Sequence, residues 1–292
     1  MLELIEDTLI DSIKLLPFLF ITYLIMEYIE HKTSQKARET IKKAGKYGPI
    51  IGSTLGVFPQ CGFSVSATNL YAARVITLGT LISVYLSTSD EMLPIFLSEA
   101  VPIQTILIVL GLKLVIGMIA GFLVDFVIRL INKNKGMKIE KNKNIEEVCE
   151  SGHCHCNEDG IFKSALKHTA SIFVFIVIVT LLINLLIYFI GEENISNFLM
   201  DKPIIGPIIS GIIGLIPNCA ASVIITKMYL QGVISFASMM TGLLVGAGVG
   251  LAVLFKTNKG IKENLKIVIL LYLIGVIAGI ILEQISIFNV IL

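Results

Sequence analysis

Long apolar stretches separated by short charged segments dominate the chain. Four of them, residues 10–29, 103–131, 172–190 and 267–282, are close to or above the roughly 20 residues that a helix needs to cross a bilayer. Of the 292 residues, 55% are hydrophobic and only 15% are charged, whereas soluble domains carry about a quarter charged residues. The pattern predicts an all-α integral membrane protein whose solvent is the lipid bilayer.

The second half of the chain repeats the first at an offset of 158 residues. Without a gap, 13 of the 29 positions in residues 48–76 are identical to those in residues 206–234, and the identities include Pro59 with Pro217 and Cys61 with Cys219. Internal symmetry of this kind is typical of secondary transporters, in which the substrate binds near the membrane midplane between two repeats. A duplication without mechanistic meaning is the alternative.

Basic residues concentrate in three loops, which the positive-inside rule places in the cytoplasm. These loops follow residue 29, follow residue 131 and precede residue 267, and their basic residues are Lys32, Lys36, Arg38, Lys42, Lys43, Lys46, Lys133, Lys135, Lys138, Lys141, Lys143, Lys256, Lys259, Lys262 and Lys266. The acidic segments 90–99 and 192–201 then face outward, as do both termini. We therefore expect a multi-pass protein of the cytoplasmic membrane.

This topology requires residues 47–74 to begin and end on the cytoplasmic side. A re-entrant helical hairpin with its tip at residues 59–62 satisfies the requirement, and residues 202–231 would form its counterpart, entering from outside with a tip at 217–220. Irregular backbone at membrane depth is tolerated where protein or a water-filled cavity surrounds it. The alternative is a kinked full span at each proline, with one exception to the charge rule.

The predicted fold is therefore two inverted repeats, each with three transmembrane helices and one re-entrant hairpin, or ten helices if half-helices are counted. An odd number of crossings in each repeat inverts the second copy. The first repeat covers residues 1–131, a cytoplasmic linker covers 132–160, and the second repeat covers 161–292.

The two hairpin tips carry the polar residues that we predict to bind substrate. They are Gln60, Cys61, Ser64 and Thr68 in the first repeat, and Asn218, Cys219, Ser222 and Thr226 in the second. A thiolate from each repeat suits a soft cation or trivalent arsenic better than magnesium or calcium. Alternatively, both cysteines are small buried packing residues.

Carboxylates follow the next apolar stretch at Asp90 and Glu91, where the second repeat has the glycine-rich segment 246–250. Carboxylates at a membrane segment often mark ion or proton pathways, so one of them is a candidate coupling group. An ordinary acidic outer loop explains them equally well. Gly111, Gly117 and Gly121 indicate close helix packing.

The linker concentrates three thiols and two imidazoles in eight residues: Cys149, His153, Cys154, His155 and Cys156. Short tracts of this composition bind soft or borderline metals, and a reducing cytoplasm keeps the thiols free. We predict a flexible capture or sensing segment; the alternative is a solvated linker with adventitious metal affinity.

Several motifs resemble those of the ten-helix heavy-metal exporter family, whose members are labelled arsenic efflux proteins or manganese transporters. They are VFPQCGFS at 57–64, NLY at 69–71, VITLGTL at 75–81 and LSTSDEMLP at 86–94. The resemblance extends to the second tip and the linker and so covers the whole chain. It implies efflux across the cytoplasmic membrane, and its ten helices equal six spans plus four half-helices.

These observations predict a secondary active exporter that moves a heavy-metal or metalloid ion by alternating access to a midplane site between the tips. The chain has no GxxxxGK[ST] phosphate loop, so proton exchange is the simplest energy source. We expect no required cofactor, no nucleic-acid partner and no enzymatic activity; a homo-oligomer is compatible with such a chain.

Three other functions stay open on the sequence. Paired half-helix N-termini with Lys227 could hold a small anion. An intramembrane enzyme could use Cys61 or Ser64 as a nucleophile, although no histidine lies within a hairpin to act as its base. A structural or receptor role would leave the matched tips unexplained.

Overall fold

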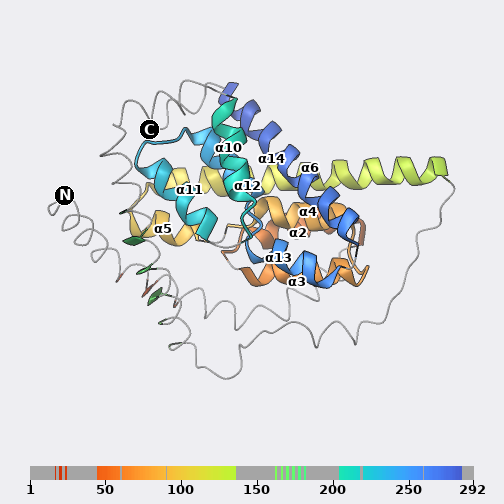
Figure 1. Cartoon of the computed structure of the whole chain (residues 1–292), viewed down its shortest axis with the longest axis horizontal. Coiled ribbons are helices and arrows are strands. Elements are labelled where there is room, and N and C mark those ends of the chain that lie inside the picture. The colour runs from red at the N-terminus through yellow and green to blue at the C-terminus, as the bar shows by residue number, and fades with distance from the viewer. Residues whose placement is uncertain are drawn as a thin grey trace.

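The computed structural model describes residues 45–59, 61–89, 91–135, 204–217, 220–258 and 260–284, together with single residues between 17 and 24 and between 162 and 181. Every regular element in these ranges is a helix (Figure 1). The expectation of an all-helical protein is confirmed for this part of the chain. The predicted spans at 10–29 and 172–190, and the linker, lie outside the described ranges.

The helices form two sets in the same order. The first set is η1 (Gly45–Tyr47), α2 (Gly48–Gly56), α3 (Cys61–Ala72), α4 (Leu78–Ser87), α5 (Met92–Ser98) and α6 (Ile103–Lys135). The second is α10 (Ile205–Gly214), α11 (Ala220–Leu230), α12 (Phe236–Val245), α13 (Val249–Thr257) and α14 (Ile261–Gln284). For each helix from α2 to α6, adding 158 to the number of its first residue gives the first residue of its counterpart to within one residue.

Local capping follows the same offset. The Thr77 hydroxyl precedes α4 and accepts a hydrogen bond from the Thr80 amide, and the Ser235 hydroxyl precedes α12 and accepts one from the Ser238 amide. Each side chain satisfies one of the backbone donors that a helix start leaves unpaired. Asp125 on α6 adds to the first cap, because its carboxylate accepts from Thr77 Oγ1 at 2.7 Å and from the Gly79 amide at 2.9 Å.

Within the described ranges, three stretches are long and apolar enough to cross a membrane: Ile103–Ile131, Phe236–Thr257 and Ile261–Gln284. The first and third confirm the helices expected at 103–131 and 267–282. The second consists of α12 and α13, which are separated by a short non-helical segment at residues 246–248.

Small residues let the helices of each set approach closely. A Cβ added to Gly56 on α2 would lie 2.0 Å from Ser87 Oγ on α4, and one added to Gly121 on α6 would lie 2.6 Å from the Gly79 carbonyl oxygen. The predicted packing role of Gly117 and Gly121 is therefore confirmed. For Gly111 no such contact is found, because no atom of the described residues lies within 4 Å of a Cβ added there.

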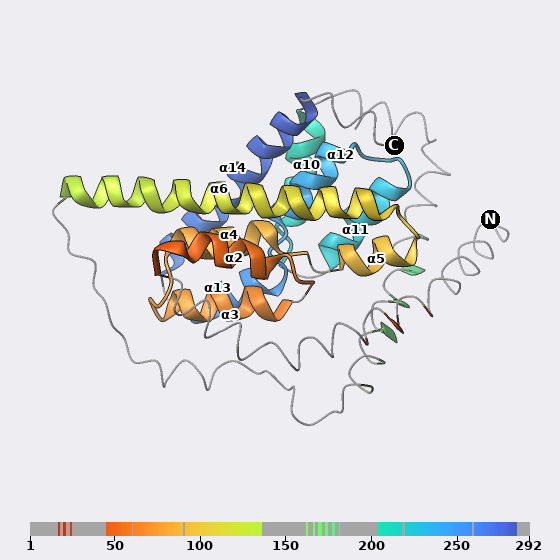
Figure 2. The same ribbon diagram turned by 180° about the vertical axis from the view of Figure 1, so that it is seen from behind.

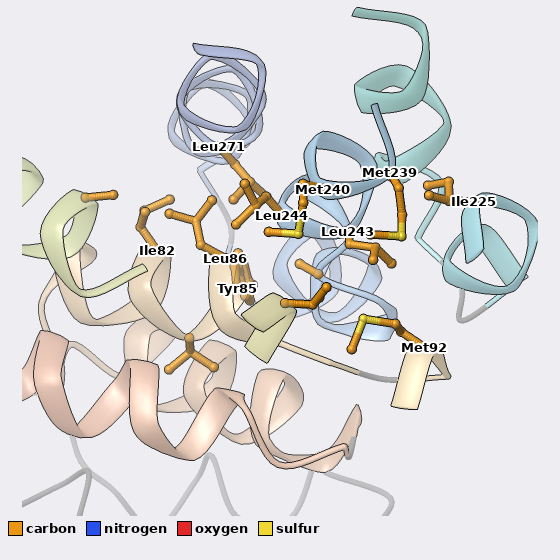
Figure 3. Close-up of a cluster of buried hydrophobic side chains, with 14 of the residues drawn as sticks. Ile82, Tyr85, Leu86, Met92, Ile225, Met239, Met240, Leu243, Leu244 and Leu271 are labelled. Carbon is orange, nitrogen blue, oxygen red and sulfur yellow. The ribbon is translucent and has the colours of Figure 1, made fainter. Parts of the chain in front are cut away.

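The two sets pack together through exchanged contacts. Helix α3 of the first set packs against α13 of the second, α11 of the second packs against α5 of the first, and α4 meets α12 between them. Side chains of both sets form one apolar core at this junction; Figure 3 shows Tyr85, Leu86, Met240 and Leu244 among them.

Two opposite ends of the helical bundle can be distinguished (Figures 1 and 2). We call one the Arg74 end, where α3 ends and where α4 and α14 begin. We call the other the Lys227 end, where α11 ends, where α12 begins and where α5 connects to α6. Helix α2 runs parallel to α4 and α3 runs back, so the α2–α3 pair begins and ends at the Arg74 end.

The structure corrects the prediction of an acidic outer loop at residues 90–99. Residues Met92–Ser98 form the short helix α5, most of whose side chains are buried in the core. The polar sequence at 87–91 marks a break between two helices that are both packed, and it does not begin an exposed loop.

Candidate transport site

The central feature of the fold is a pair of interrupted helices. Helix α4 ends at Ser87 and α5 begins at Met92, while α12 ends at Val245 and α13 begins at Val249. Gly248 has φ +54°, a left-handed conformation that residues with a side chain rarely adopt. Each interruption leaves carbonyl groups at one helix end and N–H groups at the next without intrahelical partners, and such groups can bind an ion.

The two predicted hairpin tips lie at the level of these interruptions. The last residue of α2, Gly56, contacts Ser87 at the end of α4; a Cβ on Gly214, the last residue of α10, would lie 2.4 Å from the Gly242 carbonyl oxygen near the end of α12. The chain therefore turns at both tips beside a helix break. Gln60, Asn218 and Cys219 lie outside the described residues, and for Cys61 only the backbone is described, so the thiolate pair stays a prediction.

Ser64 and Thr68 belong to a buried polar cluster that joins α3, α4 and α13. Thr68 Oγ1 lies 2.7 Å from the Ser64 carbonyl oxygen, 2.6 Å from Tyr85 Oη and 3.3 Å from the Gly250 carbonyl oxygen. Tyr85 Oη also donates to the Gly250 carbonyl at 3.2 Å. The Thr68 hydroxyl is thus already engaged in linking the two sets of helices.

Thr226, the counterpart of Thr68 on α11, has a different environment. It is fully buried, and its Oγ1 has no hydrogen-bond partner. The positions that correspond to Tyr85 and Gly250 hold Leu243 and Met92, and Leu243 has no hydroxyl that could replace the contact with Tyr85. Leu243 and Met92 both lie in the core near α11 (Figure 3). Ser222, one turn earlier, is half-buried.

The predicted coupling carboxylates fall at the α4–α5 break. Glu91 is buried, with 6% of its surface exposed, directly before α5. Glu91 is therefore not part of an exposed acidic loop, and its role as a coupling carboxylate stays a prediction. Asp90 lies outside the described residues.

Sequence reasoning missed Lys113, a lysine within the apolar helix α6 that is completely buried. Its ammonium group donates to the Leu243 carbonyl oxygen near the end of α12, at 2.5 Å. The signal was present in the sequence, since an ionisable residue inside a long apolar run is a functional candidate by default.

An ion pair between the two sets of helices lies at the Arg74 end. Arg74, in the turn after α3, pairs with Glu263 on α14 through two hydrogen bonds of 2.6 and 2.8 Å, and Tyr71 donates to the same carboxylate at 2.5 Å. The hydrogen bond with Glu263 raises the pKa of Arg74. The guanidinium is therefore a permanent positive charge in this contact.

A second ion pair between the sets lies at the Lys227 end. The buried ammonium of Lys227 on α11 pairs with Glu99, in the connection from α5 to α6. Lys227 lies about two turns along α11 from the tip, and its ammonium group contacts the opposite set of helices. Because its ammonium group is paired with Glu99, Lys227 does not support the alternative in which it holds a small anion at the tip.

The metal-binding prediction for the linker falls on Cys149, His153, Cys154, His155 and Cys156, which are outside the described residues. Within the described ranges no group of three or more His, Cys, Asp or Glu residues is placed to hold a metal ion.

The model of one protein family matches nearly the whole chain, over residues 2–190, 134–255 and 169–290. That family is described as "Putative, 10TM heavy-metal exporter". The chain belongs to this family. Membership confirms the resemblance found in the sequence motifs, and with the apolar helices it identifies a multi-pass membrane protein of a metal-transporter family. Searches of curated proteins and of solved structures give no match.

Proposed function

We propose that the protein is a secondary active exporter that moves a heavy-metal or metalloid ion out across the cytoplasmic membrane by alternating access. The observation that carries the proposal is the meeting of four irregular segments at one level: two helix breaks and two hairpin tips. Irregular backbone of this kind at membrane depth lines a binding cavity in many transporters.

Inverted repeats with re-entrant hairpins account for the helix directions. Helix α4 begins at the Arg74 end and α12 begins at the Lys227 end, so corresponding helices run in opposite directions. The α2–α3 pair enters and leaves at the Arg74 end, and the α10–α11 pair does so at the Lys227 end. Each pair is too short to cross a bilayer and return, since a helix of a dozen residues is only about 18 Å long.

The two inter-repeat ion pairs suit an alternating mechanism. Arg74 with Glu263 closes the contact between repeats at one end, and Lys227 with Glu99 closes it at the other. If one repeat rocks against the other around the central site, one pair separates while the other is kept. By the positive-inside rule the Arg74 end faces the cytoplasm.

The substrate ligands in this proposal are the tip thiolates of Cys61 and Cys219, and the unpaired Thr226 hydroxyl, about two helical turns along α11 from its tip, is a separate buried oxygen donor. The hydroxyl supports the proposal because a buried polar group without a partner costs free energy that a bound ion can return. Gln60, Asn218, Ser64 and Ser222 would complete the polar lining, and Glu91 is a buried carboxylate within the first break.

The test measures ion accumulation in cells that express the native protein or variants at matched membrane abundance. We expect native protein to lower accumulation of one ion among arsenite, Mn(II) and Cd(II), and a Cys61→Ser, Cys219→Ser variant to lose this effect. A comparison variant replaces the three linker cysteines, Cys149, Cys154 and Cys156, by serine; it should lower export less than the tip variant does, because the linker is predicted to capture or sense the ion and the tips to carry it. Equal export by the native protein and the tip variant would contradict the proposed ligands; no export of any ion would contradict the function.

A further inference from the structure

Lys113 places a positive charge in the middle of the molecule. It lies on α6 between residues 103 and 131, the most apolar part of the first repeat, and no part of it is exposed. Its ammonium donates to the Leu243 carbonyl oxygen at 2.5 Å. Leu243 belongs to the last turn of α12, where carbonyls lack intrahelical partners and carry the negative end of the helix dipole.

The helix register places Lys113 at the level of both helix breaks. Helix α6 runs antiparallel to α4: Gly121 lies against Gly79, and Gly117, one turn closer to the start of α6, lies against Ser83 and Ser87. One further turn brings the helix to Lys113, beside the break that follows Ser87. Since Leu243 also precedes the α12–α13 break, Lys113 connects α6 to the centre of the proposed cavity.

The repeat supplies an internal comparison for this residue. The position 158 residues later is Leu271, which is also fully buried on α14. A leucine therefore serves the same packing position in the second repeat, and the fold does not itself require a lysine. Because burying a charge in a membrane segment is costly, its presence in one repeat alone indicates a role in function.

The ionisable groups on the described helices around this part of α6 are as follows. The helices α2 and α12 contain none, and α4 contributes Tyr85, which is hydrogen-bonded to Thr68 and Gly250. Glu91 lies at the start of α5. Helix α14 carries its ionisable residues near its ends and at Tyr272, which donates to the Ile208 carbonyl, and Asp125 of α6 itself caps α4.

We propose that Lys113 carries the coupling proton of the transport cycle, an inference that rests on the proposed export function. An ammonium group and a cationic substrate repel each other strongly in a poorly hydrated cavity, so the site holds one or the other. When a cation enters from the cytoplasm, the ammonium releases one proton to cytoplasmic water and remains as the neutral amine. After the cation leaves to the outside, the amine takes up one proton from there. One proton thus moves inward for each cation exported.

The carbonyl contact gives the α12–α13 break a way to respond to substrate. The ammonium is attracted to the negative end of α12, whereas the neutral amine can still donate a hydrogen bond but no longer carries the charge. Binding of a cation therefore weakens the contact between α12 and α6. This contact joins the two repeats.

The test measures proton release when purified protein in detergent and weak buffer binds Mn(II), Cd(II) or arsenite, with a pH-sensitive dye. We expect the native protein to release one proton more per bound cation than the Lys113→Leu variant. Leucine is chosen because the second repeat has Leu271 at the corresponding position. Lys113→Met serves the same purpose if the leucine variant does not purify as a folded protein. Lys266→Leu removes an exposed lysine of α14 and should release as many protons as the native protein.

Lys113→Arg separates coupling from a structural role. Arginine keeps a permanent charge and can still donate to Leu243, so a purely structural lysine predicts near-native binding by this variant. Coupling predicts that cation affinity falls at least tenfold, because the charge cannot leave. Equal proton release by the native protein and Lys113→Leu, or binding of arsenite but neither cation, would overturn the inference while leaving the exporter proposal intact. Binding of no probe would instead contradict the exporter proposal.

Discussion

Thr68 and Thr226 occupy equivalent positions in the two repeats, and the structure predicts opposite effects when each is changed to valine. Valine has nearly the same shape as threonine but lacks the hydroxyl. At position 68 the change removes the contacts with Tyr85 and two carbonyls. At position 226 it removes a fully buried hydroxyl that has no partner.

The magnitudes follow from the hydrogen bonds that each variant gains or loses. Thr68→Val should destabilise by about 1–2 kcal/mol, because buried hydrogen bonds are lost while Tyr85 keeps its bond to Gly250. Thr226→Val should be neutral or stabilising by about 1 kcal/mol, because the cost of burying an unpaired hydroxyl is removed. The two variants should therefore differ by about 2–3 kcal/mol in stability.

Thermal unfolding of the two purified variants in detergent measures this difference. At about 2–4 °C per kcal/mol, Thr226→Val should melt about 4–12 °C above Thr68→Val. The same Thr226→Val protein should bind the exported ion more weakly than native protein, since it loses a proposed oxygen ligand. Equal destabilisation by the two substitutions would refute the reasoning, because it would mean that the Thr226 hydroxyl is already paired.

Two further comparisons test packing and charge. Gly121→Ala should lower stability by about 1–2 kcal/mol, because its new methyl group meets the backbone of α4. Gly111→Ala on the same helix should be neutral or stabilising. Thermal unfolding in detergent compares the two variants, and similar melting temperatures would argue against the close helix contact. Glu99→Gln should destabilise the protein more than Glu263→Gln, because it leaves the buried Lys227 without its counter-charge. The pair of Arg74 with Glu263 is more exposed and contributes about 1 kcal/mol or less. Chemical unfolding measures both variants, and the reverse order of stability would contradict this difference in burial.

Features that extend over many residues could be predicted from the sequence. The helices at 103–131 and 267–282 follow from hydropathy averaged over about 20 residues. The offset of 158 residues rests on many identities, and the first residues of the helices in the two halves follow it. Family membership rests on several motifs, beginning with the segment around Pro59. The inversion of the repeats and the insertion of the hairpins into the membrane stay predictions.

Features that depend on single neighbours could not be predicted in the same way. The sequence predicts an outer loop at residues 90–99, because an unwound stretch inside a bundle has the same polar composition as a surface loop. Thr68 and Thr226 occupy equivalent positions in the sequence repeat. They differ in their neighbours in the fold, since the positions of Tyr85 and Gly250 correspond to Leu243 and Met92 in the other repeat. Lys227 lies close to a tip in sequence but pairs with Glu99. Lys113 was visible as a lone charge, but its contact with α12 required the three-dimensional arrangement.

Distances across the two ends of the protein test alternating access most directly. Spin labels on non-natural amino acids, which leave the cysteines intact, would be placed in pairs at exposed positions: Tyr47 with Ile261 at the Arg74 end, and Ile103 with Ile204 at the Lys227 end. Electron–electron distance measurements in lipid nanodiscs would follow both pairs on addition of the ion selected by the accumulation assay. The account predicts that one distance increases while the other decreases. Distances that stay fixed at both ends, or that change in the same direction, would contradict it.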